Sequence, residues 1–205
     1  MTRGKFIAFE GGEGTGKSTQ LHLLAQTLTE RGIDHVVTRE PGGTKDAEAL
    51  RELLLDPAKS WGARAEALLF AAARADHVDR LIRPALAHGQ WILCDRYLAS
   101  SRAYQGAAGG ISQADLTMLH QFGSEGLLPD MTFVLQLDPD VALARAAARD
   151  VGGNDRIGGR HKIYHAQVND FFQSFVQADD PAVAAIAAHG SPQDVHRRIV
   201  SILFP

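Results

Sequence analysis

The chain has 205 residues, 45% hydrophobic and 22% charged, and a formal charge of −3 at pH 7. This length suits one α/β domain with its own core, and the weak charge disfavours a broad nucleic-acid-binding or membrane-binding surface. The single cysteine, Cys94, excludes a disulfide framework, and there is no signal-peptide pattern or membrane-spanning run, so we expect a cytoplasmic enzyme.

Five short apolar runs are typical of strands in a parallel sheet. They are rich in β-branched, aromatic or aliphatic residues and have turn signals nearby. Because they alternate with helical patterns, they indicate an α/β fold whose sheet is covered by helices on both faces. The predicted strands are 6–10, 35–39, 91–95, 132–137 and 183–188.

Three helical patterns are clear between and after these strands. Residues 17–31 place leucines on one face, and Gly32 can end that helix in a left-handed cap. The alanine-rich pattern over 64–88 contains Pro84, which predicts a kink or break just before it. The last helix begins after Ser191, a suitable N-cap in a capping box.

Residues 150–160 do not have the pattern of a helix or strand. The segment combines glycines with two arginines, Arg156 and Arg160. Glycine makes such a loop costly to order, and arginine suits phosphate oxygens. Two interpretations stay open, a plain solvated loop and a small lid that orders over bound nucleotides.

Residues 11–18 match the phosphate-binding pattern G-x-x-x-x-G-K-[ST] in full, between a predicted strand and a predicted helix. The glycines allow backbone N–H groups to surround phosphates at the positive end of the helix. Lys17 is expected to reach the β- and γ-phosphates of ATP, and Ser18 to bind Mg²⁺. The expected ATP-binding residues are Gly11, Gly12, Glu13, Gly14, Thr15, Gly16, Lys17, Ser18 and Thr19.

The variable positions of this loop carry no basic residue. Arginines from elsewhere must therefore offset the charge of the transferring phosphoryl group. Glu13 places a carboxylate among phosphates, which is unfavourable unless it faces another group. A sugar hydroxyl is one such partner, and plain exposure to solvent is the alternative.

The class of P-loop protein follows from what accompanies the motif. A GTPase needs Asn-Lys-x-Asp, and neither Asn154 nor Asn169 begins one. A motor ATPase usually has Asp-Glu after a strand, whereas this chain has Asp95 followed by Arg96, which suits gripping a second phosphate. A small-molecule kinase that excludes water is favoured. A non-catalytic ATP-binding protein is the distant alternative.

The chain resembles the thymidylate kinases from about residue 6 to 202. The resemblance lies in Phe9-Glu10-Gly11, the run from Thr38 to Thr44, Leu50-Arg51, the run from Leu69 to Arg74, Asp95-Arg96-Tyr97, Tyr104-Gln105-Gly106, Pro129-Asp130 and Asp155-Arg156. It implies one kinase domain over 1–205, with the P-loop nucleotide monophosphate kinase fold, a five-stranded parallel sheet, a lid at about 150–160 and a homodimer. The implied reaction is phosphoryl transfer from ATP to dTMP with Mg²⁺, and another nucleotide monophosphate kinase is the alternative. The arginine-bearing lid resembles the family's bacterial type.

The resemblance also implies roles for single residues on the acceptor side. Phe70 would stack on thymine and Arg74 would hydrogen-bond it, with Ser100, Ser101 and Gln105 nearby. Tyr104 would crowd the sugar 2′ position, and Glu13 would meet the 3′-hydroxyl. Arg51 and Arg96 would bind the acceptor phosphate.

Catalysis is expected to be alignment plus charge neutralisation, because the acceptor oxygen is already anionic and needs no general base. Lys17, Arg96, Arg149 and Arg156 are the expected catalytic residues, and the resemblance places Arg145 against adenine. Glu40–Pro41 is an expected cis peptide by the same resemblance. Gly158 and Gln136 depart from the family pattern.

Overall fold

The computed structural model describes residues 3–149 and 155–205, with Arg149 described by its backbone alone. The strands are β1 (Phe6–Glu10), β2 (His35–Arg39), β3 (Trp91–Asp95), β4 (Met131–Gln136) and β5 (Val183–Ala187). The helices before β3 are α1 (Lys17–Glu30), α2 (Lys45–Leu55), α3 (Ala63–His77), the π-helical η1 (Val78–Ile82) and α4 (Arg83–Ala87). Those after it are α5 (Leu98–Ser101), the π-helical η2 (Arg102–Ala107), α6 (Gln113–Ser124), α7 (Pro139–Arg149), α8 (Lys162–Val176) and α9 (Pro192–Leu203).

The five strands form one parallel sheet in the order β2-β3-β1-β4-β5. β1 lies at the centre, between β3 and β4, and all five of its residues are buried. All the carboxyl ends therefore point to one edge of the sheet, where open α/β folds bind their ligands. The expected five-stranded parallel sheet is confirmed, and only the last two strands differ from their predicted bounds, by one residue each.

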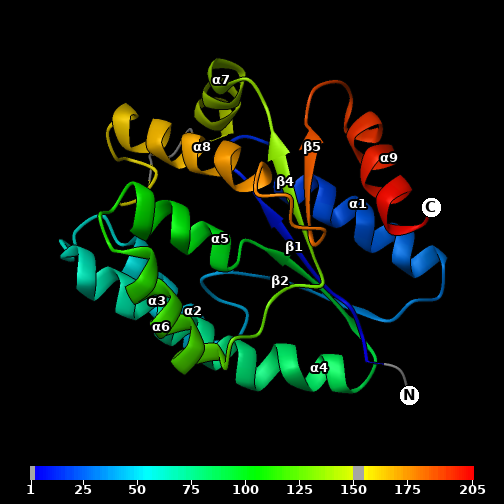
Figure 1. The fold of residues 1–205 in the computed structure, drawn as a ribbon, viewed down its shortest axis with the longest axis horizontal. Helices are drawn as coiled ribbons and strands as arrows, with labels where there is room; N and C mark the ends of the chain where they lie inside the picture. The colour runs from blue at the N-terminus through cyan, green and yellow to red at the C-terminus, as the bar shows by residue number, and fades with distance from the viewer. Residues whose placement is uncertain (1–2, 150–154) are drawn as a thin grey trace.

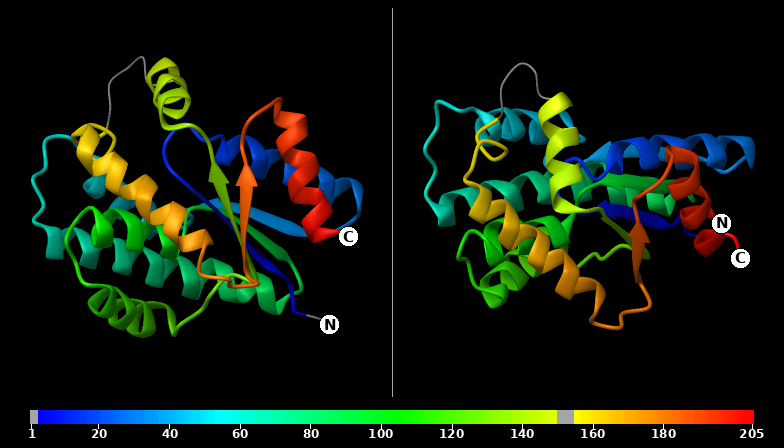
Figure 2. Two further views of the ribbon diagram at one scale, coloured as in Figure 1. Left: turned by 45° about the horizontal axis from the view of Figure 1, so that its top comes forward. Right: turned by 90° about the horizontal axis from the view of Figure 1, so that it is seen from above.

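Successive residues of β1 serve two separate cores, as the alternation of side chains along a strand requires. Ile7 and Phe9 point to a core built with the leucines of α1 and with α9. Phe6 and Ala8 point to the opposite core, under η1 and α4. The two further views show α1 and α9 together beside one face of the sheet and α8 across the other (Figures 1 and 2).

The helical pattern over 64–88 is broken where proline predicts it. An α-helix ends at His77, a π-helical turn covers Val78–Ile82, and Pro84 lies in the first turn of the α-helix that follows. Pro84 is tolerated there because a residue in the first turn of an α-helix does not need to donate its backbone N–H to the preceding turn. The left-handed Gly32, the capping box at Ser191 and the cis peptide before Pro41 are confirmed as well.

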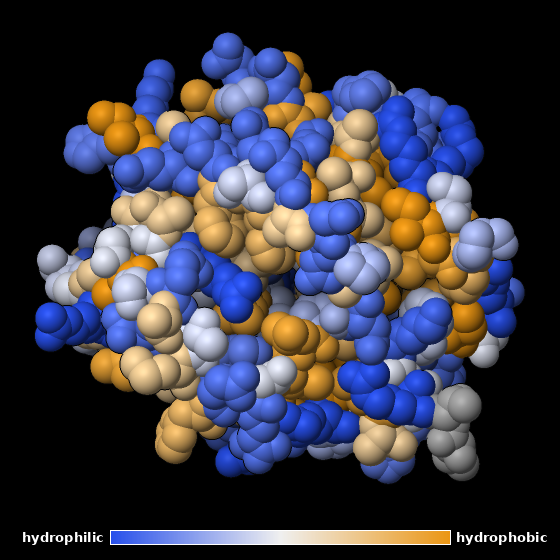
Figure 3. All heavy atoms as spheres, in the orientation of Figure 1, coloured by the Kyte–Doolittle hydropathy of each residue, from blue (hydrophilic) through white to orange (hydrophobic). Residues whose placement is uncertain are grey.

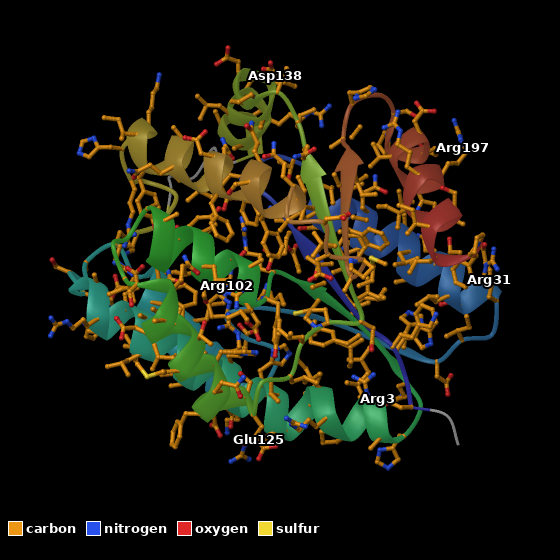
Figure 4. The ribbon with its side chains drawn as sticks, viewed as in Figure 1. Arg3, Arg31, Arg102, Glu125, Asp138 and Arg197 are labelled. Carbon is orange, nitrogen blue, oxygen red and sulfur yellow. The ribbon has the colours of Figure 1, made fainter. Side chains whose placement is uncertain are left out.

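The amino edge of the sheet is closed by the end of the chain. Phe204 stacks on Trp91 with ring centroids 6.0 Å apart, and the Arg31 guanidinium lies 4.0 Å over Phe204. Nearby, Arg3 pairs with Asp130 across 2.9 Å, and Figure 4 shows Arg3 and Arg31 at this end of the molecule. Cation–π and aromatic contacts of this kind stabilise an edge far from the carboxyl ends of the strands.

Hydrophilic and hydrophobic side chains are interspersed over the face shown in Figure 3. Within residues 3–149 and 155–205, no helix has the length and apolarity that a membrane span requires.

Candidate active site

The loop between β1 and α1 has the geometry of a phosphate cradle. Gly14 and Gly16 have φ of 70° and 95°, a left-handed conformation that glycine adopts without strain. A Cβ on Gly14 would also lie 2.0 Å from the carbonyl oxygen of Ala142, so α7 approaches the loop too closely for any side chain. The Thr15 hydroxyl donates to the Gly12 carbonyl oxygen at 3.0 Å and closes the turn.

Lys17 lies inside this loop. Its Nζ donates to the carbonyl oxygens of Gly11 and Gly12 at 3.1 and 2.7 Å, and the residue is 7% exposed. Burial, followed by the positive charge of Arg96, lowers the pKa of Lys17 to about 8. The lysine is thus held where phosphate oxygens would replace the two carbonyl contacts.

Ser18, in the first turn of α1, meets the end of β3. Its hydroxyl donates to Oδ2 of Asp95 at 2.5 Å. A hydroxyl and a carboxylate side by side are the hard oxygen donors that Mg²⁺ accepts from proteins, with phosphates and water completing its shell. Among the described residues there is no cluster of three or more His, Cys, Asp or Glu side chains that could hold a metal ion. Asp95 as a partner of Ser18 was missed from the sequence.

Arg96 joins the phosphate loop to the acceptor side. Its Nη1 donates to the Gly11 carbonyl oxygen at 3.0 Å and to the Ser100 hydroxyl at 3.1 Å. Its Nη2 donates to Oε1 of Glu13 at 2.5 Å. The Gly11 carbonyl oxygen thus accepts from both Arg96 and Lys17. The two cations expected to face the acceptor and donor phosphates therefore converge on one atom.

A buried carboxylate fixes the turn that carries Arg96. Arg96 has φ 71°, an uncommon conformation for a residue with a side chain. Glu10 accepts from the backbone N–H groups of Tyr97 and Ser100 at 2.8 and 3.0 Å and from the Ser100 hydroxyl at 2.6 Å. Its burial raises the pKa of Glu10, while these hydrogen bonds hold the start of α5 in place.

Tyr104 and Glu13 complete the wall beside Arg96. The Tyr104 hydroxyl donates to Oε1 of Glu13 at 3.2 Å, and the Arg96 guanidinium lies 5.0 Å from the Tyr104 ring. Burial raises the pKa of Tyr104, so its hydroxyl stays neutral. The structure brings together the three residues that were expected to surround the sugar and the acceptor phosphate.

Arg51 reaches the same region from α2. The helix begins after Thr44, whose side chain accepts from the Ala47 amide, and acidic residues in its first turn complement the helix dipole. Nη1 of Arg51 donates to the carbonyl oxygen of Pro41 at 2.9 Å. Burial, followed by the charge of Arg39, lowers the pKa of Arg51.

The residues expected to bind the base lie on α3 and α5. Phe70 is partly buried beside the core around Tyr104. Arg74 is buried and donates Nε to Glu40 at 2.7 Å and Nη2 to the Ser101 hydroxyl at 2.9 Å. Its Nη1 makes no hydrogen bond to the residues that the structure describes. Arg74 is thus held by protein contacts with one donor nitrogen left over for a ligand.

Two carboxylates that contact Arg74 or Gln105 were given no side-chain role from the sequence. Glu40 binds Arg74, and its Oε1 lies 3.1 Å from Nδ1 of His77. Glu66, on α3, accepts from Gln105 Nε2 at 3.0 Å. Glu66 lies in the first turn of α3, where acidic residues are common on exposed helices. Its position therefore gives no local signal of burial, because its partners come from distant segments.

Of the expected lid, residues 155–160 are described and form turns, while residues 150–154 lie outside the described part. Arg156 donates Nε to the Leu54 carbonyl oxygen at 2.7 Å and Nη2 to Oε2 of Glu66 at 2.6 Å. Arg160 also binds Oε2 of Glu66. The structure thus places Arg156 at the end of α2 rather than at Lys17. Arg149 ends α7, and its side chain lies outside the described part.

A small cavity adjoins Glu66. Trp61, Gln105, Arg160 and Tyr164 line it. The indole Nε1 of Trp61 donates to the Leu53 carbonyl oxygen at 2.9 Å. The cavity thus lies between the start of α3, η2 and the start of α8.

A larger cleft of about 700 Å³ opens beside the phosphate loop, beyond the carboxyl end of β4. Gly12, Thr15, Asp138, Arg145 and His189 are among the residues that line it. Figure 4 shows Asp138 in the connection between β4 and α7, beside that helix. Its Oδ1 accepts from the backbone N–H of Asp140 at 3.0 Å. Arg145, which the resemblance places against adenine, is one of the residues that line this cleft.

Comparison with known proteins agrees with this geometry. The family model described as thymidylate kinase matches residues 9–199. The chain belongs to the thymidylate kinase family. Members of this family transfer a phosphoryl group from ATP to dTMP. The alternative of a non-catalytic ATP-binding protein is thereby set aside.

Individual thymidylate kinases match the chain over nearly its whole length. One from Rhizorhabdus wittichii is 49% identical over 201 residues, covering 98% of this chain and 97% of the relative. One from Symbiobacterium thermophilum is 45% identical over 204 residues, covering 98% and 94%. The crystal structure of thymidylate kinase from Ehrlichia chaffeensis superposes with a TM-score of 0.80 at 30% identity, covering 98% of this chain and 99% of that chain. The expected bacterial type of the family is confirmed by these relatives.

Proposed function

We propose that this chain is a dTMP kinase that transfers the terminal phosphoryl group of ATP to dTMP, giving dTDP and ADP. One observation carries the proposal beyond family membership. Lys17 and Arg96 donate to the same carbonyl oxygen, that of Gly11. A donor phosphate held by Lys17 and an acceptor phosphate held by Arg96 would therefore be adjacent, which is the alignment that direct transfer needs.

On the donor side, the loop amides and Lys17 bind the ATP phosphates, and the cleft beside Arg145 receives adenine. Ser18 and Asp95 would hold Mg²⁺ together with phosphate oxygens. When bound, Mg²⁺ neutralises charge on the phosphates during transfer. The Ser18 hydroxyl would offer an oxygen lone pair to the ion, which leaves its hydrogen available to Asp95.

On the acceptor side, Arg96 and Arg51 bind the dTMP phosphate, and Phe70 and Arg74 receive thymine. Tyr104 lies against the sugar, and Glu13 accepts from its 3′-hydroxyl. The phosphate oxygen attacks as an anion, so none of these residues has to remove a proton.

The negative charge that spreads over the transferring phosphoryl group is offset by Lys17, by Arg96 and by the arginines at 149 and 156. Arg156 must exchange its contact with Glu66 for one with phosphate. Inserted arginines in other P-loop enzymes contribute about 10³–10⁵ in rate. Most of this charge thus comes from outside the phosphate loop, which itself offers only Lys17.

A coupled assay of ADP release across the nucleoside monophosphates tests the activity. We expect dTMP to be the preferred acceptor, with a margin of only a few-fold over dUMP, because one buried methyl contributes about 0.8 kcal/mol. Lys17→Met should abolish nearly all turnover and keep the circular dichroism spectrum of the parent. A Lys17→Met variant that keeps more than about a tenth of the parent rate would disprove the assignment of Lys17.

We also propose that the protein is a homodimer that pairs through α3 and α6. These helices pack on each other and expose Leu68, Met118 and Phe122, the last of which is 92% exposed. Exposed apolar side chains grouped on a helix pair are typical of a protein interface. Phe122→Asp should give a monomer by light scattering, whereas Ile163→Asp, on the exposed side of α8, should not.

The cytoplasm is the proposed location. The single cysteine is a buried thiol whose pKa is raised by burial, and the substrates of the reaction are nucleotides. Fractionation of the source cells with activity measured in each fraction tests this proposal.

A further inference from the structure

Glu66 holds two guanidinium groups on one carboxylate oxygen. Its side chain is 3% exposed. Oε1 accepts from Gln105 at 3.0 Å, and Oε2 accepts from Arg156 at 2.6 Å and from Arg160. A buried carboxylate needs one positive partner to offset its charge, and losing the only one is strongly unfavourable. Glu66 therefore has two cationic partners, Arg156 and Arg160, where one is enough to offset its charge.

The two arginines are otherwise anchored to different elements. The backbone N–H of Arg156 donates to the Leu55 carbonyl oxygen at 3.1 Å, and its Nε donates to Leu54. The guanidinium of Arg160 lies 4.5 Å over the ring of Tyr164, whose hydroxyl donates to the Tyr104 carbonyl oxygen at 2.8 Å. Arg156 can therefore change its side-chain contacts while Arg160 keeps its place against α8.

Arg156 is also the arginine that lies beside the acceptor side. The carbonyl oxygens that Arg156 binds, those of Leu54 and Leu55, belong to the helical turn of α2 that follows Arg51. Turning to the phosphates costs Arg156 its bond to Glu66. Without another cation, Glu66 would then be buried with only the Gln105 amide, and the loss would oppose the movement.

We propose that Arg160 is a positioning residue, which keeps Glu66 neutralised when Arg156 turns to the phosphates of the bound nucleotides. This inference rests on the proposed role of Arg156. Arg160 itself touches no substrate in this scheme. It already binds the oxygen that Arg156 vacates, so Glu66 need not move, and its other oxygen keeps the amide of Gln105 in place for the acceptor.

A double-mutant cycle between residues 66 and 160 tests the proposal. Arg160→Ala should lower kcat about tenfold and leave the KM for ATP within about twofold, because the stranded charge matters only when Arg156 is engaged. Glu66→Gln removes the charge that needs a partner. In that background Arg160→Ala should change kcat by less than about twofold. An equal loss in both backgrounds would overturn the proposal.

A second pair of variants leaves Glu66 intact, in case its replacement disturbs the fold. Arg160→Lys keeps a positive charge and should retain kcat within about threefold, whereas Arg160→Gln should lose about tenfold. Equal losses in the two variants would show that shape rather than charge matters, and the proposal would be wrong. Melting temperatures of both report any general loss of structure, which a purely structural role would produce without the difference in kcat.

Arg156→Ala separates this inference from the function on which it rests. If its kcat falls while residues 66 and 160 show no coupling, the role of Arg160 is wrong and the role of Arg156 stands. If its kcat is unchanged, the proposed role of Arg156 is wrong whatever Arg160 does. Coupling between residues 66 and 160, together with a loss of kcat in Arg156→Ala, is the result that supports both.

Discussion

The hydroxyl of Ser18 donates to the carboxylate of Asp95 at 2.5 Å, and so joins the first turn of α1 to the end of β3. If the pair holds Mg²⁺, Ser18→Ala should lower turnover and raise the Mg²⁺ concentration needed for half-maximal rate, both by about tenfold or more. Ser18→Thr keeps the hydroxyl and should behave like the parent. The check is a titration of rate against Mg²⁺ at fixed ATP, and identical curves for the parent and Ser18→Ala would contradict the assignment.

Lys17 should give the reaction an alkaline limit. Because burial lowers the pKa of Lys17 to about 8 in the free protein, the lysine loses its charge above that pH and attracts phosphate less. We expect kcat/KM for ATP to fall as pH rises through about 8. At saturating ATP the phosphates hold the proton on Lys17, so kcat/KM for dTMP should fall only at higher pH. If kcat/KM for ATP and kcat/KM for dTMP fall at the same pH, a group other than Lys17 causes the alkaline limit.

The same shift has an opposite effect on stability. The folded pKa of Lys17 lies below its ordinary value of 10.5, so between about 8 and that value the unfolded chain binds more protons. The contribution of Lys17 to the free energy of unfolding therefore rises with pH across this window. Urea unfolding of the parent and of Lys17→Met, compared across these pH values, isolates that contribution.

Tyr104 should set the preference for deoxyribose. Its ring packs beside Arg96, and its hydroxyl donates to Glu13. Tyr104→Ala removes the ring and should raise kcat/KM for the ribonucleotide acceptor relative to dTMP by about tenfold. Tyr104→Phe keeps the ring as the control and should leave that ratio near the parent value. If the ratio is the same in Tyr104→Ala and the parent, the ring does not read the sugar.

Arg149, at the end of α7, and Arg156, in the segment that follows, should act in the transition state. Arg149→Ala and Arg156→Ala should each lower kcat by at least about tenfold while the KM for ATP changes little, since contacts made chiefly in the transition state affect kcat. Steady-state kinetics of both single variants and of the double variant measure this. If only the KM for ATP rises, these arginines bind nucleotide without assisting transfer.

The buried pair of Glu40 and Arg74 should matter more for stability than the exposed pair of Arg39 and Glu48. Glu40→Gln leaves the buried Arg74 without its carboxylate and should lower the free energy of unfolding by about 3–5 kcal/mol. Glu48→Gln removes the exposed pair with Arg39 and should cost about 1 kcal/mol or less. Urea unfolding of the two variants compares them directly, and similar losses would contradict the distinction.

The main features of the fold follow from local patterns in the sequence. The first three strands have their predicted bounds because each is a short run of mostly β-branched, aromatic or aliphatic residues. Pro84 predicted a break, and the π-helical turn before it relieves the clash that proline would cause in a regular α-helix. These outcomes depend on residues close together in the chain, and patterns report such residues well.

The side-chain partners in the site could not be predicted in the same way. Glu66 joins α3, η2 and the segment after residue 154, and Asp95 meets Ser18 across 77 positions of sequence. Such contacts depend on how the helices pack against the sheet and against one another, and residue spacing along the chain does not encode that packing. The left-handed Arg96 was missed too, because the hydrogen bonds of Glu10 that hold its turn come from another strand.

The two tryptophans of the chain lie in different surroundings. Trp91 is stacked under Phe204 at the amino edge of the sheet, whereas Trp61 lines the cavity of Glu66, Arg160 and Tyr164. Replacing Trp91 by Phe leaves the indole of Trp61 as the single long-wavelength emitter. Its emission then reports on the surroundings of Glu66 at each stage of nucleotide addition, in solution and without a foreign label.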